Sequence, residues 1–221
     1  MKDYCSLKQI REEISTNKTS CKQLVKGYLK NISKNTNINA FIDVYEKIYR
    51  DIKKIRPETK IFPTFQLEDL YGLLDLQDNR SWESVEIFSG IMDVLAISTF
   101  PYLTDIDSTQ SLATNYYLSL QQRFPGELMI FEAAYPSKSV DTYPLIGTEG
   151  DQNTFIKKLL NDAEAGGFST IIWLAPLDPF IANNGDSKIF RDVGLKKKTG
   201  EPKEAWHSWA TWAKRPYILK K

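Results

Sequence analysis

Several residues that can act as acids, bases or nucleophiles follow short apolar runs, at the point where a strand would end. Glu132 directly follows the run 128–131, and Tyr135 comes shortly after it. A glutamate carboxylate can attack an electrophilic carbon or transfer a proton, and an aromatic ring offers an apolar surface to a ligand. The remaining polar or aromatic candidates at strand ends are Gln66, Glu68, Tyr102 and Trp173. Together these residues predict a site for nucleophilic or acid–base chemistry.

Four apolar runs of strand length would position the candidates. The runs cover 61–65, 94–98, 128–131 and 170–174, and segments of helical pattern lie at 45–56, 82–88, 113–123, 154–165 and 203–210. Because the runs are nearly continuous instead of alternating, we expect parallel strands that are covered on both faces. The sequence therefore predicts an α/β fold of repeated βα units, with the candidate residues at the carboxyl edge of the sheet.

The length limits how many such units the chain can hold. A complete (βα)8 barrel typically needs about 250 residues, whereas this chain has 221 and begins with a different segment. We therefore expect a partial (βα)8 (TIM) barrel of four to five βα units over residues 45–221. A partial barrel leaves two strand edges unpaired, which predicts a homodimer through those edges or aggregation. Alternatively, helices within 7–33 cover one of the edges.

The first 44 residues have the pattern of a helical hairpin. Ser6 with Gln9, and Ser20 with Gln23, have the spacing of a capping box, in which the two side chains satisfy amides at a helix start. Apolar residues at helical spacing follow each box. Residues 1–44 are therefore predicted to form an N-terminal helical hairpin separate from the partial barrel.

Three segments of the larger region carry a resemblance to a known family. They are FEAAYPS at 131–137, STFPYL at 98–103, and IW at 172–173 followed by GEPKEAW at 200–206. In this order they resemble the seventh, sixth and eighth units of retaining barrel glycoside hydrolases, especially the endo-β-1,4-galactanase type. The resemblance implies that Glu132 is the nucleophile, that Tyr102 orients it, and that a β-linked polysaccharide or oligosaccharide is bound. Trp173, Tyr135 and Gln66 are then the candidate substrate-binding residues.

One departure from that family concerns the second carboxyl group. A retaining glycosidase needs an acid/base about 5 Å from its nucleophile, and the family's acid/base is a Glu preceded by Asn, a dipeptide that this chain does not contain. Glu68 is the candidate substitute, and Phe100 stands where the family has Tyr. Two interpretations stay open. The chain is a retaining glycosidase that works as a dimer or with an unrecognised acid, or it is a carbohydrate-binding or otherwise non-catalytic remnant. In a purely structural interpretation, Glu132 is only a polar strand end and Trp173 belongs to the core.

The N-terminal segment resembles a different family. SLKQI at 6–10, TSCKQLV at 19–25 and NAFI at 39–42 are similar to the opening of amidase-signature enzymes, such as the amidase component of the Glu-tRNA(Gln) amidotransferase. The family's catalytic Lys and two Ser lie in a downstream Gly/Ser-rich region, which has no counterpart here. An amidase-related fragment is therefore the alternative function, and a natural fusion or a joined or truncated reading frame would each explain two partial families in one chain.

Composition excludes several classes of partner and cofactor. A net charge of +1 gives no bulk attraction for nucleic acid or an anionic membrane. Neither a secretory-type start nor an apolar run of about 18 residues is present, so we expect a soluble, cytoplasmic protein. His207 is the only histidine, which excludes a multi-histidine metal site, and we expect neither a metal nor a cofactor.

Overall fold

The computed structural model describes residues 7–16, 18–20, 23, 40–74, 82–140, 147–181 and 186–216. The chain divides into two compact units, Met1–Ile48 and Tyr49–Lys221. The division falls within a helix, α3 (Ala40–Ile55), which begins earlier than the predicted helix at 45–56. The predicted domain boundary between residues 44 and 45 stays a prediction.

The first unit contains α1 (Leu7–Ser15), which agrees with the first helix of the predicted hairpin. The second capping box is present: the Gln23 amide donates to Ser20 Oγ at 3.2 Å, and Gln23 Oε1 accepts from the Ser20 amide at 2.9 Å. Ser6 and nearly all of the second predicted helix lie outside the described residues, and so do several residues of the amidase-like segments. The described residues therefore do not show the amidase resemblance.

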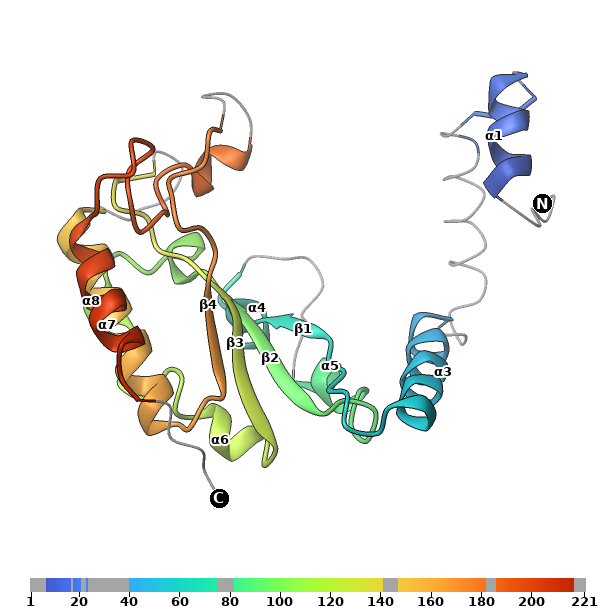
Figure 1. Cartoon of the computed structure of the whole chain (residues 1–221), viewed down its shortest axis with the longest axis horizontal. Coiled ribbons are helices and arrows are strands. Elements are labelled where there is room, and N and C mark those ends of the chain that lie inside the picture. Colours follow the sequence, from blue (N-terminus) through green and yellow to red (C-terminus); the bar gives the residue numbers. More distant parts are fainter. Residues whose placement is uncertain are drawn as a thin grey trace. The chain divides into compact units, whose positions relative to one another are not determined.

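The second unit is built on a parallel sheet of four strands in sequence order (Figure 1). The strands are β1 (Thr64–Gln66), β2 (Val94–Thr99), β3 (Glu127–Ala133) and β4 (Thr170–Trp173). They confirm the predicted α/β fold with a parallel sheet. The first strand begins at Thr64 and not at residue 61, because Pro63 has no amide hydrogen to donate and the Ile61 amide donates to Asp93 Oδ2 at 2.8 Å.

Two long helices cover β3 and β4, and the other connections are short. The long helices are α7 (Glu149–Ala165) and α8 (Glu204–Ala213), which lie side by side (Figure 1). The short helices are α4 (Leu67–Leu70), α5 (Glu83–Glu86) and α6 (Leu120–Arg123), with 3-10 turns η1 (Pro101–Leu103), η2 (Thr109–Ser111) and η3 (Asp186–Phe190). The helices predicted at 82–88 and 113–123 were therefore too long. The helix predicted from 154 begins at Glu149, because Thr148 Oγ1 caps it by accepting from the Asp151 amide at 3.1 Å.

The two faces of the sheet differ in burial at β3 and β4, whereas β2 is buried on both faces. Leu95, Ile97 and Ile130 point to the helices and belong to one buried core with residues of α7. On the opposite side, which we call the inner face, Phe131 is 39% exposed and Ile172 is 41% exposed. This side corresponds to the interior of a closed barrel. The described part of the chain therefore leaves apolar interior surface uncovered, as expected for a partial barrel.

Candidate functional site

A β-bulge near the carboxyl end of β3 determines where Glu132 points. Ile97 pairs with Ile130, but the next residue of β2, Ser98, pairs with Glu132, so β3 has one extra residue at this point. In a regular strand Glu132 would face the helices, as Ile130 does. With the bulge, Ile130 and Ala133 both stay in the core and Glu132 turns to the inner face. The bulge therefore makes this carboxylate accessible.

A cavity of about 360 Å³ lies beside Glu132, within the size range of small-ligand sites, roughly 300–1,000 Å³. Phe100 follows β2 and Leu174 follows β4, so the cavity lies at the carboxyl edge of the sheet. Its lining residues are Phe100, Glu132, Leu174, Ala175, Pro179, Phe190 and Val193. Glu132 is the only ionisable residue among them. The site thus offers one carboxylate to a ligand whose remaining contacts are apolar or aromatic.

A row of aromatic rings connects the cavity to α7. Phe100 and Tyr102 have ring centroids 6.3 Å apart, Tyr102 and Tyr135 are 6.2 Å apart, and Tyr135 stacks on Phe155 at 4.7 Å. The side chains of Tyr102 and Tyr135 are fully buried. These two candidate residues therefore support the cavity wall through packing. The predicted hydrogen bond from Tyr102 to Glu132 stays a prediction.

Trp173 also lies behind the cavity and does not line it. Its indole Nε1 donates to the Val193 carbonyl at 2.8 Å, and its ring packs against Phe155 and Trp209. This burial favours the interpretation in which Trp173 belongs to the core. A role for Trp173 in stacking on a sugar stays a prediction that this packing does not support.

Glu68 lies in α4, and its carboxylate is fully buried. It accepts hydrogen bonds from Thr99 Oγ1 at 2.7 Å, from the Phe100 amide at 3.0 Å and from the Tyr116 hydroxyl at 3.0 Å, and also from Gln66 Nε2. The structure thus brings the two candidates Gln66 and Glu68 together, but neither lines the Glu132 cavity. Glu68 as the acid/base therefore stays a prediction.

Burial raises the pKa values of ionisable groups in the Glu68 cluster. Desolvation raises the pKa of the Glu68 carboxyl group, and the hydrogen bonds from Phe100, Thr99 and Tyr116 oppose that rise. The pKa of the Tyr116 hydroxyl is raised by burial and by the nearby Glu68 charge, so Tyr116 stays a hydrogen-bond donor. The cluster is a set of satisfied polar groups inside the core.

The sequence did not point to Phe190, Val193 or Pro179 as lining residues. All three follow β4 in a connection whose described residues form neither a strand nor a long helix, and nothing in their residue types marks a site. The sequence marks Phe100 only as a departure from the family pattern. Among the described residues, no group of three or more His, Cys, Asp or Glu side chains is placed to hold a metal ion, and no described helix is long and apolar enough to cross a bilayer.

No family model and no curated protein matches the sequence, but solved structures match the fold. A β-glucuronidase from an uncultured Clostridium species superposes with a TM-score of 0.53 at 16% identity, over 82% of this chain and 31% of that protein. A glycoside hydrolase family 17 β-1,3-glucanosyltransferase from Rhizomucor miehei gives a TM-score of 0.53 at 14% identity, over 81% of this chain and 68% of that one. Xylanase 10B from Thermotoga maritima gives 0.51 at 14% identity, over 76% and 50%.

These similarities concern the fold, since the identities are low. The chain spans about a third of the length of the β-glucuronidase and half that of the xylanase. The parallel four-stranded sheet with its helices corresponds to part of the barrel in these proteins. The chain therefore has an α/β fold of the partial TIM-barrel type, similar to that of glycoside hydrolases.

Proposed function

We propose that the second unit acts on or binds a β-linked polysaccharide or oligosaccharide, with Glu132 as the group that faces the sugar. The observation that carries this proposal is a single carboxylate, turned by a bulge into an apolar cavity at the carboxyl edge of a parallel sheet. Sites in barrels of this type occupy that edge. The glycoside hydrolase fold of the solved structures supports the same substrate class.

The chemistry open to Glu132 is that of a retaining glycosidase. One carboxylate oxygen forms a bond to the anomeric carbon while the bond from that carbon to the leaving oxygen breaks, and an acid gives its proton to the leaving oxygen. Water then hydrolyses the glycosyl ester and releases the carboxylate. The acid must lie about 5 Å from the nucleophile, and no second carboxyl group is among the described residues that line the cavity. Another chain or another part of this chain must therefore supply it.

We further propose that a second copy of the chain supplies this group by closing the barrel as a homodimer. In the sheet of the described residues, β1 pairs only with β2 and β4 only with β3, so each has an unpaired edge. A two-fold axis parallel to the strands would place β1 of each copy beside β4 of the other and keep all eight strands parallel. The two Glu132 carboxylates would then face each other across the mouth of the barrel.

The second candidate function is carbohydrate binding without turnover. The observation that favours it is that Glu132 is the only ionisable residue among the described residues of the cavity lining, because a single carboxylate provides no general acid. An amidase-related activity has no support among the described residues. Hydrolysis and binding share a ligand class, so the same glycosides test both.

The experiment combines light scattering with assays on a panel of aryl β-glycosides. A heterodimer of wild type and Glu132→Gln, isolated with two different tags, should be as inactive as the Glu132→Gln homodimer if both carboxylates are needed. Half of the wild-type activity would show instead that each copy works alone, and a monomeric chain would overturn the shared site. Binding of a β-linked oligosaccharide without turnover would favour the non-catalytic function, and neither binding nor turnover would overturn the proposal.

A further inference from the structure

The segment Asp192–Leu195 forms one wall of the Glu132 cavity through Val193, and side chains from several elements hold it. Gln152 of α7 donates its Nε2 to the carbonyls of Val193 at 3.3 Å and Gly194 at 3.2 Å, and Trp173 of β4 donates to the Val193 carbonyl. From the loop after β3, the Ser137 amide donates to the Asp192 carbonyl at 2.9 Å. The segment is therefore held by hydrogen bonds from α7, from β4 and from the loop after β3.

Lys203 joins these attachments at the start of α8. Its side chain is only 2% exposed, and Nζ lies 2.6 Å from Asp178 Oδ1, 2.8 Å from Ser137 Oγ and 3.2 Å from the Asp192 carbonyl oxygen. These three acceptors use all three donors of the ammonium group. Ser137 comes from the loop after β3 and Asp178 from the loop after β4. A single buried charge thus connects both loops to α8.

Asp178 links Lys203 to the cavity wall. Its Oδ1 also accepts from the Gly194 amide at 2.9 Å. A Cβ at position 194 would lie 2.1 Å from the Asp178 amide nitrogen and 2.2 Å from the Leu177 carbonyl carbon, so only glycine fits there. The Gly194 backbone and the Asp178 carboxylate are therefore in direct contact beside Val193. Any movement of Asp178 must move the wall.

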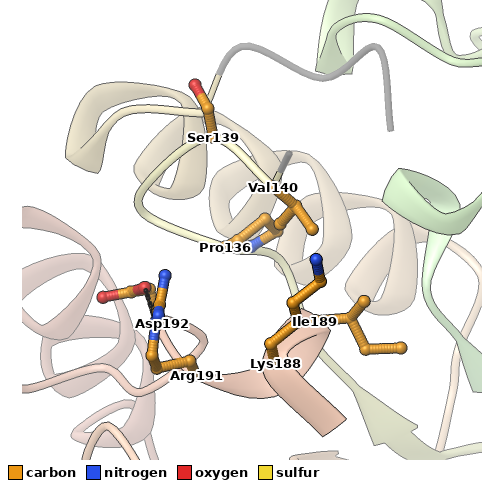
Figure 2. Close-up of a pocket in the computed structure, with 7 residues that line it drawn as sticks. All are labelled: Pro136, Ser139, Val140, Lys188, Ile189, Arg191 and Asp192. Atoms are coloured by element: carbon orange, nitrogen blue, oxygen red, sulfur yellow. Dashed lines mark hydrogen bonds and ion pairs between the residues drawn. The ribbon is translucent and has the colours of Figure 1, made fainter. Parts of the chain in front are cut away.

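The loops also meet directly outside this cluster. Figure 2 shows Pro136 and Val140 of the loop after β3 opposite Lys188 and Ile189 of η3. The gap between them has a volume of about 10 Å³, which is room for about one water molecule and not for a ligand. It is a packed seam between two loops. The described residues of the two loops therefore pack directly against each other at this seam.

We propose that Lys203 is a positioning residue that sets the shape of the Glu132 cavity by fastening the loops after β3 and β4 to the start of α8. The inference rests on the proposed function for its kinetic consequence but not for its structural one. Lys203 does not activate Ser137 as a nucleophile, because Ser137 Oγ donates onward to the Asp192 carbonyl at 3.0 Å and is buried. Its effect on a sugar passes through Asp178 and Gly194.

Amide hydrogen exchange measured by NMR on the full chain tests the structural part. Lys203→Met should accelerate exchange of the Ser137 and Gly194 amides by at least about tenfold, since their acceptors lose their common partner. Lys197→Met is the matched control, because Lys197 is nearby but pairs with Glu201 in an exposed position. Unchanged protection in Lys203→Met would overturn the proposal. If Lys203→Met does not fold, Ser137→Ala removes one acceptor alone and should still accelerate exchange at Gly194, and unchanged exchange would again contradict it.

The kinetic part uses the aryl β-glycoside that the wild type turns over best. Misplacement of a wall by about 1 Å can cost up to a hundredfold in rate, so Lys203→Met should lower kcat/KM by about tenfold or more, mainly through KM. The double variant Lys203→Met with Asp178→Asn removes the unpaired charge of Asp178 but does not restore the attachment of the loops to α8. Stability should therefore recover while KM stays high. Recovery of both stability and KM would show that the Lys203–Asp178 pair acts only on stability, and would overturn the positioning role of Lys203. If the wild type neither binds nor turns over a glycoside, the proposed function fails, while the exchange rates still test whether Lys203 positions the loops.

Discussion

Glu68 follows β1 and Glu132 lies near the carboxyl end of β3, so both are at the same edge of the sheet, but their surroundings are opposite. Glu68 is fully buried and accepts from Thr99, Phe100, Tyr116 and Gln66. Glu132 is partly exposed and borders an apolar cavity. Its carboxylate makes no hydrogen bond or ion pair with the described residues.

The difference indicates which carboxylate serves the fold and which is available for a ligand. A carboxylate that is surrounded by donors has already used its hydrogen-bonding capacity, and moving it would leave several donors unsatisfied. A carboxylate in an apolar wall can interact with whatever enters the cavity. Glu68 nevertheless affects the site, because the Phe100 amide that it holds belongs to a residue of the cavity lining.

The largest expected effect comes from Glu132→Gln. The change removes the charge and keeps the size of the side chain, so we expect turnover of aryl β-glycosides to fall by about 10³-fold or more. The free energy of unfolding should stay within about 0.5 kcal/mol of wild type, because the carboxylate has no partner among the described residues to lose. Initial rates and urea unfolding of the same preparation measure both quantities. Full activity in this variant would remove Glu132 from the chemistry.

The second test compares the two faces on which β3 places its side chains. Ile130→Ala should lower the free energy of unfolding by about 3 kcal/mol, because it opens a hole in the core between sheet and helices. Phe131→Ala should cost less, about 1.5 kcal/mol in a monomer, because Phe131 is 39% exposed on the inner face and its ring packs edge-to-face against Phe62. Chemical unfolding at several protein concentrations measures both. A large, concentration-dependent cost at Phe131 would show that a second copy covers the inner face.

The sheet could be predicted from sequence because each strand is a short apolar run. The expected coverage of both faces holds for β2 but was wrong for β3 and β4, whose inner face is partly exposed among the described residues. The strand at 94–98 differs from β2 by one residue at its carboxyl end. The helix at 113–123 was overestimated, since only Leu120–Arg123 is an α-helix and the residues before it form turns. Helical spacing of apolar residues does not distinguish a helix from successive turns that pack against the same core.

The candidate site was only partly predictable, for a physical reason that Glu132 illustrates. Its position at a strand end could be read from the apolar run before it, but the bulge that turns it to the inner face involves Phe131 and Glu132, neither of which is a residue type that marks a bulge. The partners of Glu68 are equally hidden, because Thr99 and Tyr116 are 31 and 48 residues away in the chain. Such contacts follow from the packing of distant segments and not from local pattern.

The third prediction concerns Glu68→Gln, which should destabilise the fold by about 2 kcal/mol at neutral pH. An amide group has one acceptor oxygen in place of two, so donors such as Thr99 Oγ1 or the Phe100 amide would face an NH2 group. Thermal and urea unfolding measure the change, with Glu132→Gln as the control that alters the same residue type without a buried network. Equal stability of the two variants would remove the contrast between the two glutamates.

The smallest expected effect is the pH dependence of that destabilisation. Burial raises the pKa of Glu68 in the folded chain above its unfolded value, so the stability that Glu68 contributes is fully present below the unfolded pKa and is lost as the pH rises through the folded pKa. The difference in unfolding free energy between wild type and Glu68→Gln should therefore be larger near pH 4 than near pH 8. Urea unfolding of both proteins at several pH values measures it.

Asp93 provides the control of opposite sign. Burial alone would raise the pKa of Asp93, but hydrogen bonds from Lys53, the Ile61 amide and Tyr49 hold it below the usual value. Its contribution is therefore present above the unfolded pKa and lost as the pH falls, so the difference between wild type and Asp93→Asn should shrink toward pH 3. If the Glu68→Gln difference also shrank on acidification, the carboxylate would be held in its ionised form by its donors. Glu68 would then belong with the ion-paired carboxylates, and burial would not be the effect that separates it from Glu132.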